Sequence, residues 1–133
     1  MIAPMKRRPT DAELAILRVL WERGPSTVRA VWEEMGRGGR DVGYTTALKL
    51  LQIMSDKGLV ERDERGHSHI YRAARSEAHT QRVLVRDLLD RAFGGSAEKL
   101  ILRALDARRV PAEELAKIRS LLNQLDDDKG GAT

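Results

Sequence analysis

The sequence predicts a mainly α-helical protein that carries one small β-hairpin near its middle. The first observation is a helical pattern over residues 42–57 that ends at Gly58. The second is a pair of short apolar segments around a charged tip, ending near Arg72. The third is the run of helix-forming residues after Ser76. A period of 3.6 residues indicates helices, and a glycine-containing polar tip between apolar segments indicates a hairpin.

Two helices are expected before the central stretch. Thr10 and Glu13 have the spacing of a capping box, and the first helix then ends at Gly24. The second covers residues 28–35 behind a serine–threonine cap, and a glycine-rich connection over residues 36–41 follows it. The apolar positions at helical spacing are Leu14, Leu17, Leu20, Trp21, Val28, Val31, Trp32 and Met35.

The predicted helix over residues 44–57 has two faces of different chemistry. The apolar face holds Tyr44, Ala47, Leu50, Leu51 and Met54, and the polar face holds Thr45, Lys49, Gln52 and Asp56, with Leu48 and Ile53 on the flanks. Glutamine and threonine read donor and acceptor patterns on bases, lysine takes a phosphate or a guanine, and leucine can touch a thymine methyl. We therefore interpret this segment as a recognition helix for the major groove of DNA.

The hairpin behind this helix is basic on both sides of its tip. Leu59, Val60, Ile70 and Tyr71 bracket the turn sequence at residues 63–66. The basic side chains are Arg62, Arg65, His67 and Arg72, which suit contacts to phosphates or the minor groove. Helix and hairpin together predict a winged helix-turn-helix DNA-binding domain over residues 10–75. An ordinary amphipathic helix followed by a solvated hairpin is the alternative.

The charge is uneven along the chain. The net charge of +4 lies within the first 75 residues, which hold 14 Lys and Arg against 10 Asp and Glu, while residues 76–133 hold 10 of each. A basic half of this kind favours the salt-sensitive part of nucleic-acid affinity. Residues 1–9 are expected to form a flexible basic arm. Either Lys6, Arg7 and Arg8 follow a phosphate backbone, or the arm is an ordinary frayed terminus.

Three further helices are expected over residues 76–125, followed by a disordered polar tail at 126–133. Ser76 and Ser96 cap the first two helices, and Pro111 opens the third. Their apolar faces are larger than about fifty residues can bury alone, which predicts a symmetric dimer. Folding back onto the first domain is the alternative. The residues expected at the dimer interface are Leu84, Leu88, Leu89, Phe93, Leu100, Ile101, Leu105, Leu115, Ile118, Leu122 and Leu125.

Composition argues against several other classes of protein. The absence of cysteine excludes disulfides, thiolate metal sites and a thiol nucleophile. The apolar runs are shorter than a membrane span and the N-terminus lacks a secretory signal core, so we expect a cytoplasmic protein without a membrane partner. No nucleophile–base pair, phosphate loop or dinucleotide fingerprint is present, so we expect no catalysis, metal or cofactor.

Two alternatives stay open at this point. His67 and His69 share one face of a predicted strand and could hold a metal with a third ligand, although histidines on a wing also serve as phosphate or solvent contacts. Leu48 and Ile53, if exposed, would suit a winged-helix module that binds protein instead of DNA. A steep loss of binding with ionic strength would distinguish DNA binding from this second alternative.

Two segments resemble the signature of the BlaI/MecI penicillinase-repressor family: PTDAELAILRVLWERGPSTVRAVWEEM and YTTALKLLQIMSDKGLVERDERGHSHIYR. The resemblance covers about residues 9–125 and implies a winged helix followed by three intertwining helices, in a homodimeric repressor that binds a palindromic operator. It also implies that the recognition helix meets DNA through Thr45, Thr46, Leu48 and Lys49, and the wing through residues 65–67.

The chain departs from the family pattern at three places. Ile53 stands where the family often has arginine, so that a backbone contact is either lost or supplied by Arg40 or Lys49. Lys49 itself replaces a frequent threonine, which implies a different operator. Members that respond to β-lactams are cut at an asparagine–phenylalanine pair, which implies a regulatory protease as a partner; Arg103-Ala104 stands there instead. Copper-responsive relatives use C-terminal cysteines, which this chain lacks.

Overall fold

The computed structural model describes residues 8–64, 66 and 69–131, and it divides into two compact units, Met1–Asp87 and Leu88–Thr133. The division lies twelve residues beyond the boundary expected after residue 75, inside a helix. Two contacts join the N-terminal part of the chain, at Trp21 and Arg8, to the segment that runs from Arg75 to Asp87. Trp21 Nε1 donates to the Arg75 carbonyl at 3.0 Å, and the Arg8 guanidinium pairs with the Asp87 carboxylate at 2.5 Å.

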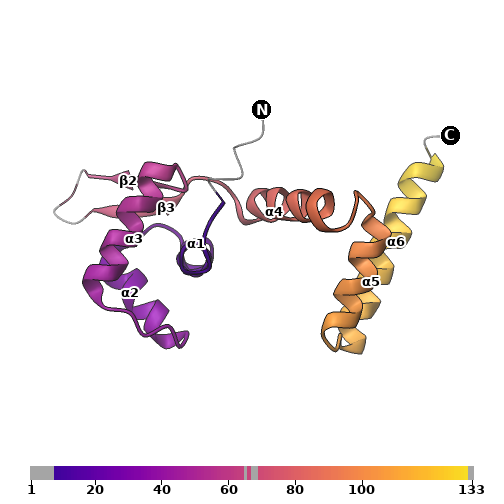
Figure 1. Ribbon diagram of the computed structural model, residues 1–133, viewed down its shortest axis with the longest axis horizontal. Helices are drawn as coiled ribbons and strands as arrows, with labels where there is room; N and C mark the ends of the chain where they lie inside the picture. The colour runs from indigo at the N-terminus through magenta and orange to yellow at the C-terminus, as the bar shows by residue number, and fades with distance from the viewer. Residues whose placement is uncertain (1–7, 65, 67–68, 132–133) are drawn as a thin grey trace. The chain divides into compact units, whose positions relative to one another are not determined.

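The first unit begins with three helices that lie against one another: α1 (Asp11–Arg23), α2 (Val28–Arg37) and α3 (Tyr44–Lys57) (Figure 1). The predicted capping box is confirmed, because the Glu13 amide donates to Thr10 Oγ1 and the Thr10 amide donates to Glu13 Oε1. Gly58, with φ 80° and ψ 16°, ends α3 in the left-handed conformation that glycine adopts without a side-chain clash.

A three-stranded antiparallel sheet completes this unit, in the order β1-β3-β2. The strands β2 (Val60–Asp63) and β3 (Ile70–Ala73) form the expected hairpin, which Figure 1 shows beside α3. The two-residue strand β1 (Ser26–Thr27) was not predicted, because only its pairing with Tyr71 and Ile70 makes it a strand. Helix, short strand, two helices and a hairpin, in this order, form a winged helix-turn-helix.

The core of the first unit lies between the three helices and the sheet. It consists of eleven buried apolar side chains: Ile16, Leu17, Leu20, Val28, Val31, Met35, Ala47, Leu51, Met54, Val60 and Tyr71. One ion pair lies at its edge, between Glu13, whose side chain is 2% exposed, and Lys57. Lys57 Nζ lies 2.9 Å from both carboxylate oxygens, so that this pair joins the start of α1 to the end of α3.

The remaining helices are α4 (Glu77–Ala92), α5 (Ala97–Ala107) and α6 (Ala112–Gly131). Ser76 and Ser96 cap α4 and α5 as predicted, through bonds from the His79 and Lys99 amides. The helix α6 continues to Gly131, so the tail that was expected to be disordered is helical over residues 126–131. Polar residues alone do not end a helix, and the first strong helix breakers after Pro111 are the paired glycines at 130 and 131.

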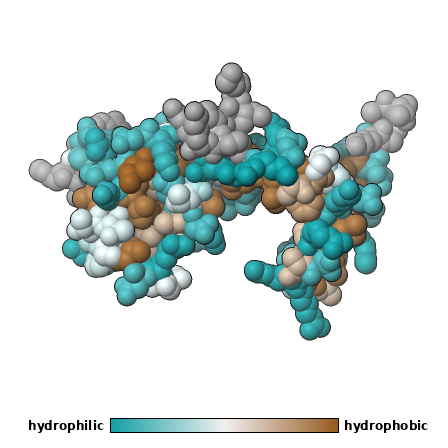
Figure 2. All heavy atoms as spheres, viewed as in Figure 1, coloured by the Kyte–Doolittle hydropathy of each residue, from teal (hydrophilic) through white to brown (hydrophobic). Residues whose placement is uncertain are grey.

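The second unit contains no buried side chain among its described residues. Figure 2 shows hydrophobic side chains on the surface of these helices. Across the described residues, no helix combines the length and the apolar character needed to cross a membrane.

Candidate nucleic-acid interface

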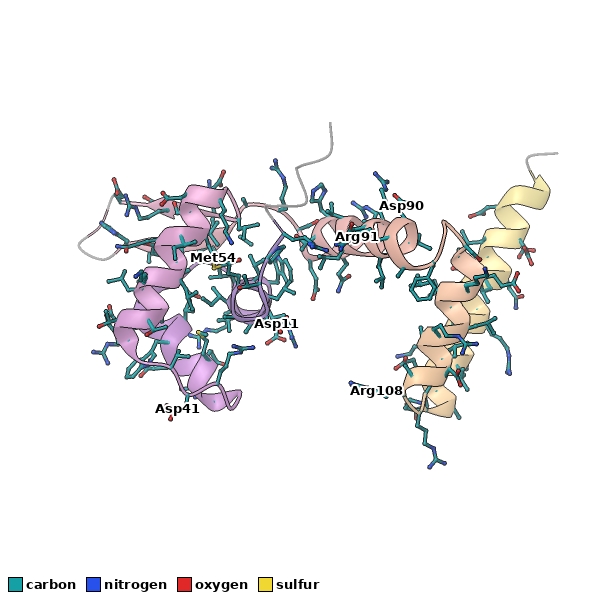
Figure 3. All side chains as sticks on the ribbon, in the orientation of Figure 1. Asp11, Asp41, Met54, Asp90, Arg91 and Arg108 are labelled. Carbon is teal, nitrogen blue, oxygen red and sulfur yellow. The ribbon has the colours of Figure 1, made fainter. Side chains whose placement is uncertain are left out.

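The helix α3 presents an exposed polar face that is held in place from behind. Thr45, Thr46, Lys49 and Gln52 are all exposed, while Leu48 is half-buried beside them. On the opposite side Ala47, Leu51 and Met54 are fully buried, and Figure 3 shows Met54 pointing from α3 into the first unit. This burial fixes the rotation of α3 about its own axis, so the polar side chains face solvent as a set.

The start of α3 differs from its end. Gly43 is the N-cap and offers no side-chain acceptor, and the first turn holds no acidic residue. The amides of this turn therefore keep their partial positive charge toward any ligand that approaches the helix start. At the end of the helix, Lys57 is engaged by Glu13 and is not available to a phosphate.

The first residue of α3 differs from the expectation of the sequence pattern. Tyr44 was assigned to the core face, but it is 42% exposed and meets the Trp32 ring edge-on, with centroids 5.7 Å apart. The Arg29 guanidinium lies 5.9 Å from the centroid of the same ring. Helical spacing alone does not reveal this cluster, because Arg29 and Trp32 come from α2 and their relation to Tyr44 is tertiary.

Arg40 lies on the connection between α2 and α3, and it is half-buried. With Arg18 and Arg37 it lines an open hollow of about 610 Å³. Arg37 forms an ion pair with Glu34, whereas Arg40 and Lys49 have no ion-pair partner within the described part of the chain. Their charges are therefore available to DNA phosphates. Asp41 points away from this connection in Figure 3.

The two basic wing residues that the structure describes, Arg62 and Arg72, are both paired with carboxylates. Arg62 pairs with Glu64, and Arg72 Nε lies 2.9 Å from Glu61 Oε1. These pairs lie on the exposed surface, where water and salt weaken them, so DNA can compete for either arginine. Two predicted contacts, Arg65 and His67, lie outside the described residues.

The structure describes only part of the predicted metal site. His69 is exposed and lies outside β3, which begins at Ile70, while His67 is not among the described residues. Over residues 8–64, 66 and 69–131, no group of three or more His, Cys, Asp or Glu side chains is placed to hold a metal ion.

The residues expected at the dimer interface lie on α4, α5, α6 and the connection after α4. Among them Leu88, Ile101, Leu105, Leu122 and Leu125 are between 37% and 56% exposed, and the other six are partly buried. Three further apolar side chains of these helices, Val85, Leu102 and Leu121, are 42%, 49% and 59% exposed. A free helical unit with this much exposed leucine has an unfavourable surface in water.

Comparisons with known proteins identify relatives whose sequences match most of the chain. The family described as "Penicillinase repressor" matches residues 9–124. A protein named transcriptional regulator BlaI from Mycobacterium tuberculosis is 32% identical over 123 residues, which is 90% of this chain and 86% of the relative. The penicillinase repressor of Bacillus licheniformis is 23% identical over 122 residues, 90% of this chain and 94% of the relative.

One solved structure completes the comparison. It is the solution structure of a homodimeric winged helix-turn-helix DNA-binding domain from Mycobacterium bovis, with 29% identity and a TM-score of 0.47, over 65% of this chain and 75% of that one. The family assignment rests on the sequence matches alone, which extend over both units. The chain belongs to the penicillinase repressor family.

Proposed function

We propose that the protein is a transcriptional repressor that binds a palindromic DNA operator as a homodimer, with α3 of each copy in the major groove. The observation that carries this proposal is the face of α3. Thr45, Lys49 and Gln52 are exposed on one side, while Leu51 and Met54 are fully buried on the other. A helix fixed in this way can enter the groove without rearrangement of the domain.

Each side chain has a definite role in this proposal. Lys49 takes guanine O6 and N7 or a phosphate, Gln52 takes adenine N6 and N7, and the methyl groups of Leu48 approach a thymine methyl. Thr45 and Thr46, with the open first-turn amides, hold a backbone phosphate near the helix start. Arg40 adds a second phosphate contact from the preceding connection, and Arg65 and His67 of the wing contact the adjacent phosphates or minor groove.

The second unit supplies the two-fold symmetry that a palindromic operator requires. Its leucines at positions 88, 105, 122 and 125 are exposed in the single chain, and a second copy offers the same surface in return. On this proposal the eleven predicted interface residues become buried between copies. A protein that acts on chromosomal DNA in this way works in the cytoplasm.

The proposal includes release from DNA by a regulatory protease only on the condition that α5 unwinds first. The bond between Arg103 and Ala104 lies within α5, and the Arg103 guanidinium pairs with Asp106 at 2.9 Å. A protease needs an extended segment, so α5 has to unwind before this bond is cut. Cleavage at this site would therefore report on the stability of α5 as well as on a matching protease.

The alternative is a winged-helix module that binds another protein through α3. Ile53, which is 37% exposed, is the observation that favours it. Its surface is small beside the polar face of α3, and the charge of +4 lies in the same part of the chain.

Selection of binding sites from a random pool of duplex DNA, read by sequencing, tests the proposal. The expected result is enrichment of a two-fold symmetric motif, whose half-sites give the spacing of the two copies. Binding to that motif should weaken steeply between low and moderate salt, in proportion to the phosphates contacted. A pool that stays unenriched at low salt would contradict the proposal.

A further inference from the structure

The connection that leads into α3 is rich in glycine and offers few side chains that could fix its backbone. Residues 38–43 join α2 to α3, and three of these six positions are glycine: Gly38, Gly39 and Gly43. Gly39 has φ 88°, and Gly43 caps α3 without any side-chain bond. Glycine loses more conformational entropy on ordering than other residues, so such a segment does not hold a helix start by itself. Another group has to fix the first turn of α3.

The first part of this connection is held by its own backbone. The Gly38 amide donates to the Glu34 carbonyl at 3.0 Å, and the Arg40 amide donates to the Met35 carbonyl at 2.9 Å. These bonds belong to the end of α2. Nearer to α3, the Val42 amide donates to the Arg40 carbonyl at 3.1 Å, which is a bond within the connection itself. Contacts from outside the connection are still needed to fix its end against α2.

Trp32 of α2 makes those contacts. Its indole Nε1–H donates to the Val42 carbonyl at 2.8 Å, across the connection. Its ring receives Tyr44, the first residue of α3, at an interplanar angle of 83°, which is the favourable edge-to-face geometry for two aromatic rings. Trp32 is itself half-buried and packs against the core of the first unit. One rigid side chain thus joins the core, the residue before the N-cap and the first residue of α3.

We propose that Trp32 is a positioning residue for DNA recognition: it sets where α3 begins relative to α2 and touches no base itself. This inference rests on the proposed function, because it assigns the source of its sequence specificity. Base readout depends on hydrogen bonds with narrow geometry, whereas phosphate contacts tolerate small displacements. A loosened start of α3 should therefore reduce specific affinity and leave nonspecific affinity unchanged.

The chain provides a matched control in its other tryptophan. Trp21 Nε1 also donates to a backbone carbonyl, that of Arg75 at 3.0 Å, but Trp21 lies on α1 and its bond is to the segment before α4. Phenylalanine at either position keeps an aromatic ring and removes only the indole N–H and part of the volume. Any difference in DNA affinity between the two variants then shows which of the two indole hydrogen bonds matters for binding.

The test compares Trp32→Phe and Trp21→Phe with the unchanged full-length chain. Each protein is titrated with the duplex obtained by site selection and with a scrambled duplex of the same length, at one fixed salt concentration. We expect Trp32→Phe to bind the selected duplex about tenfold more weakly, since an unpaired carbonyl and a looser helix start both act against it. Binding to the scrambled duplex should change less than about twofold, and Trp21→Phe should match the unchanged chain on both duplexes.

Two outcomes of this comparison would overturn the proposal. One is an unchanged affinity of Trp32→Phe for the selected duplex. The other is an equal loss on both duplexes by a folded Trp32→Phe protein, which would make Trp32 a general contact. A wild-type chain that prefers no duplex is a different failure, since it removes the proposed function before any variant is compared.

A measurement on the unchanged chain covers the case in which Trp32→Phe does not fold. Hydrogen exchange of the two indole N–H groups is followed by NMR in the free protein. We expect the Trp32 proton to exchange at least about tenfold more slowly than that of a solvent-exposed tryptophan, because its bond to Val42 has to open first. Exchange at the rate of an exposed indole would overturn the proposal.

Discussion

The two units of this chain hold themselves together by different means. The first buries eleven apolar side chains around three helices and a sheet, and it adds a partly buried ion pair between Glu13 and Lys57. The second leaves every described side chain at least partly exposed, with leucines as much as 59% exposed. A single copy of the first unit can therefore fold on its own core, whereas the second needs another surface to cover its leucines. In the proposed function, the first unit binds DNA and the second unit joins two copies of the chain.

The largest effect on stability is expected when a side chain in the core of the first unit is shortened. Leu51→Ala shortens a fully buried side chain that lies behind the exposed polar face of α3. The expected cost is about 2–5 kcal/mol in the free energy of unfolding, since both transfer energy and packing are lost. Urea denaturation followed by circular dichroism measures it. A cost below about 1 kcal/mol would show that the first unit is not organised around this core.

The matching change in the second unit is Leu122→Ala, at a side chain that is 48% exposed in the single chain. We expect weaker self-association by about 2 kcal/mol, because the change occurs in both copies. Sedimentation over a range of protein concentrations measures this effect. Ser120→Ala, at an exposed position on the polar side of the same helix, is the control and should not alter the dimer. Equal behaviour of the two variants would remove Leu122 from the interface.

The ion pair offers a test of how rigidly α3 is held. Glu13→Gln keeps an acceptor for the Thr10 amide but removes the charge that faces Lys57. We expect a loss of about 1–3 kcal/mol in unfolding free energy, since a partly buried ammonium group is left without its partner. Thermal or urea denaturation measures it. An unchanged stability would mean that solvent already compensates Lys57.

A change on the exposed polar face of α3 should leave the core of the first unit and the association through the second unit intact. Lys49 is exposed and has no ion-pair partner among the residues described. Lys49→Ala should weaken binding to the selected operator by about 1–2 kcal/mol, through loss of a base or phosphate contact. Its unfolding curve should coincide with that of the unchanged chain. Unchanged affinity and sequence preference would place the reading face elsewhere.

The smallest expected effect concerns the wing. Glu64→Gln releases Arg62 from its ion pair and removes one negative charge close to the expected DNA surface. We expect nonspecific DNA affinity to rise by about 0.2–1 kcal/mol, the usual range for an exposed pair. Titrations at two salt concentrations check it, because the gain should shrink at the higher one. A fall in affinity would mean that Glu64 helps to shape the wing.

Local chemistry predicted much of this structure. The capping box at Thr10, the stop at Gly58, the hairpin, the caps at Ser76 and Ser96 and the polar face of α3 all depend on neighbours within a few residues. Such signals can be read from a single sequence because the interacting groups are fixed by helix or turn geometry.

The features that the sequence did not predict depend on distant partners. The strand β1 exists through its pairing with β3, forty-five residues away at Ser26 and Tyr71. Tyr44 turns toward Trp32 of α2 and leaves the core face, and Arg72 is taken by Glu61 across the hairpin. The ion pair between Arg8 and Asp87 likewise joins residues that are far apart in the sequence. Tertiary partners of this kind leave no regular spacing in the sequence.

An NMR titration of the full chain with the selected duplex tests the central claim most directly. If α3 reads the groove, the largest changes in backbone amide shifts should fall on residues 44–52, and they should saturate at two chains per duplex. Amides of the buried side of the first unit, around Ile16 and Leu17, should move little. Shifts confined to regions outside α3, or saturation at one chain per duplex, would contradict the account.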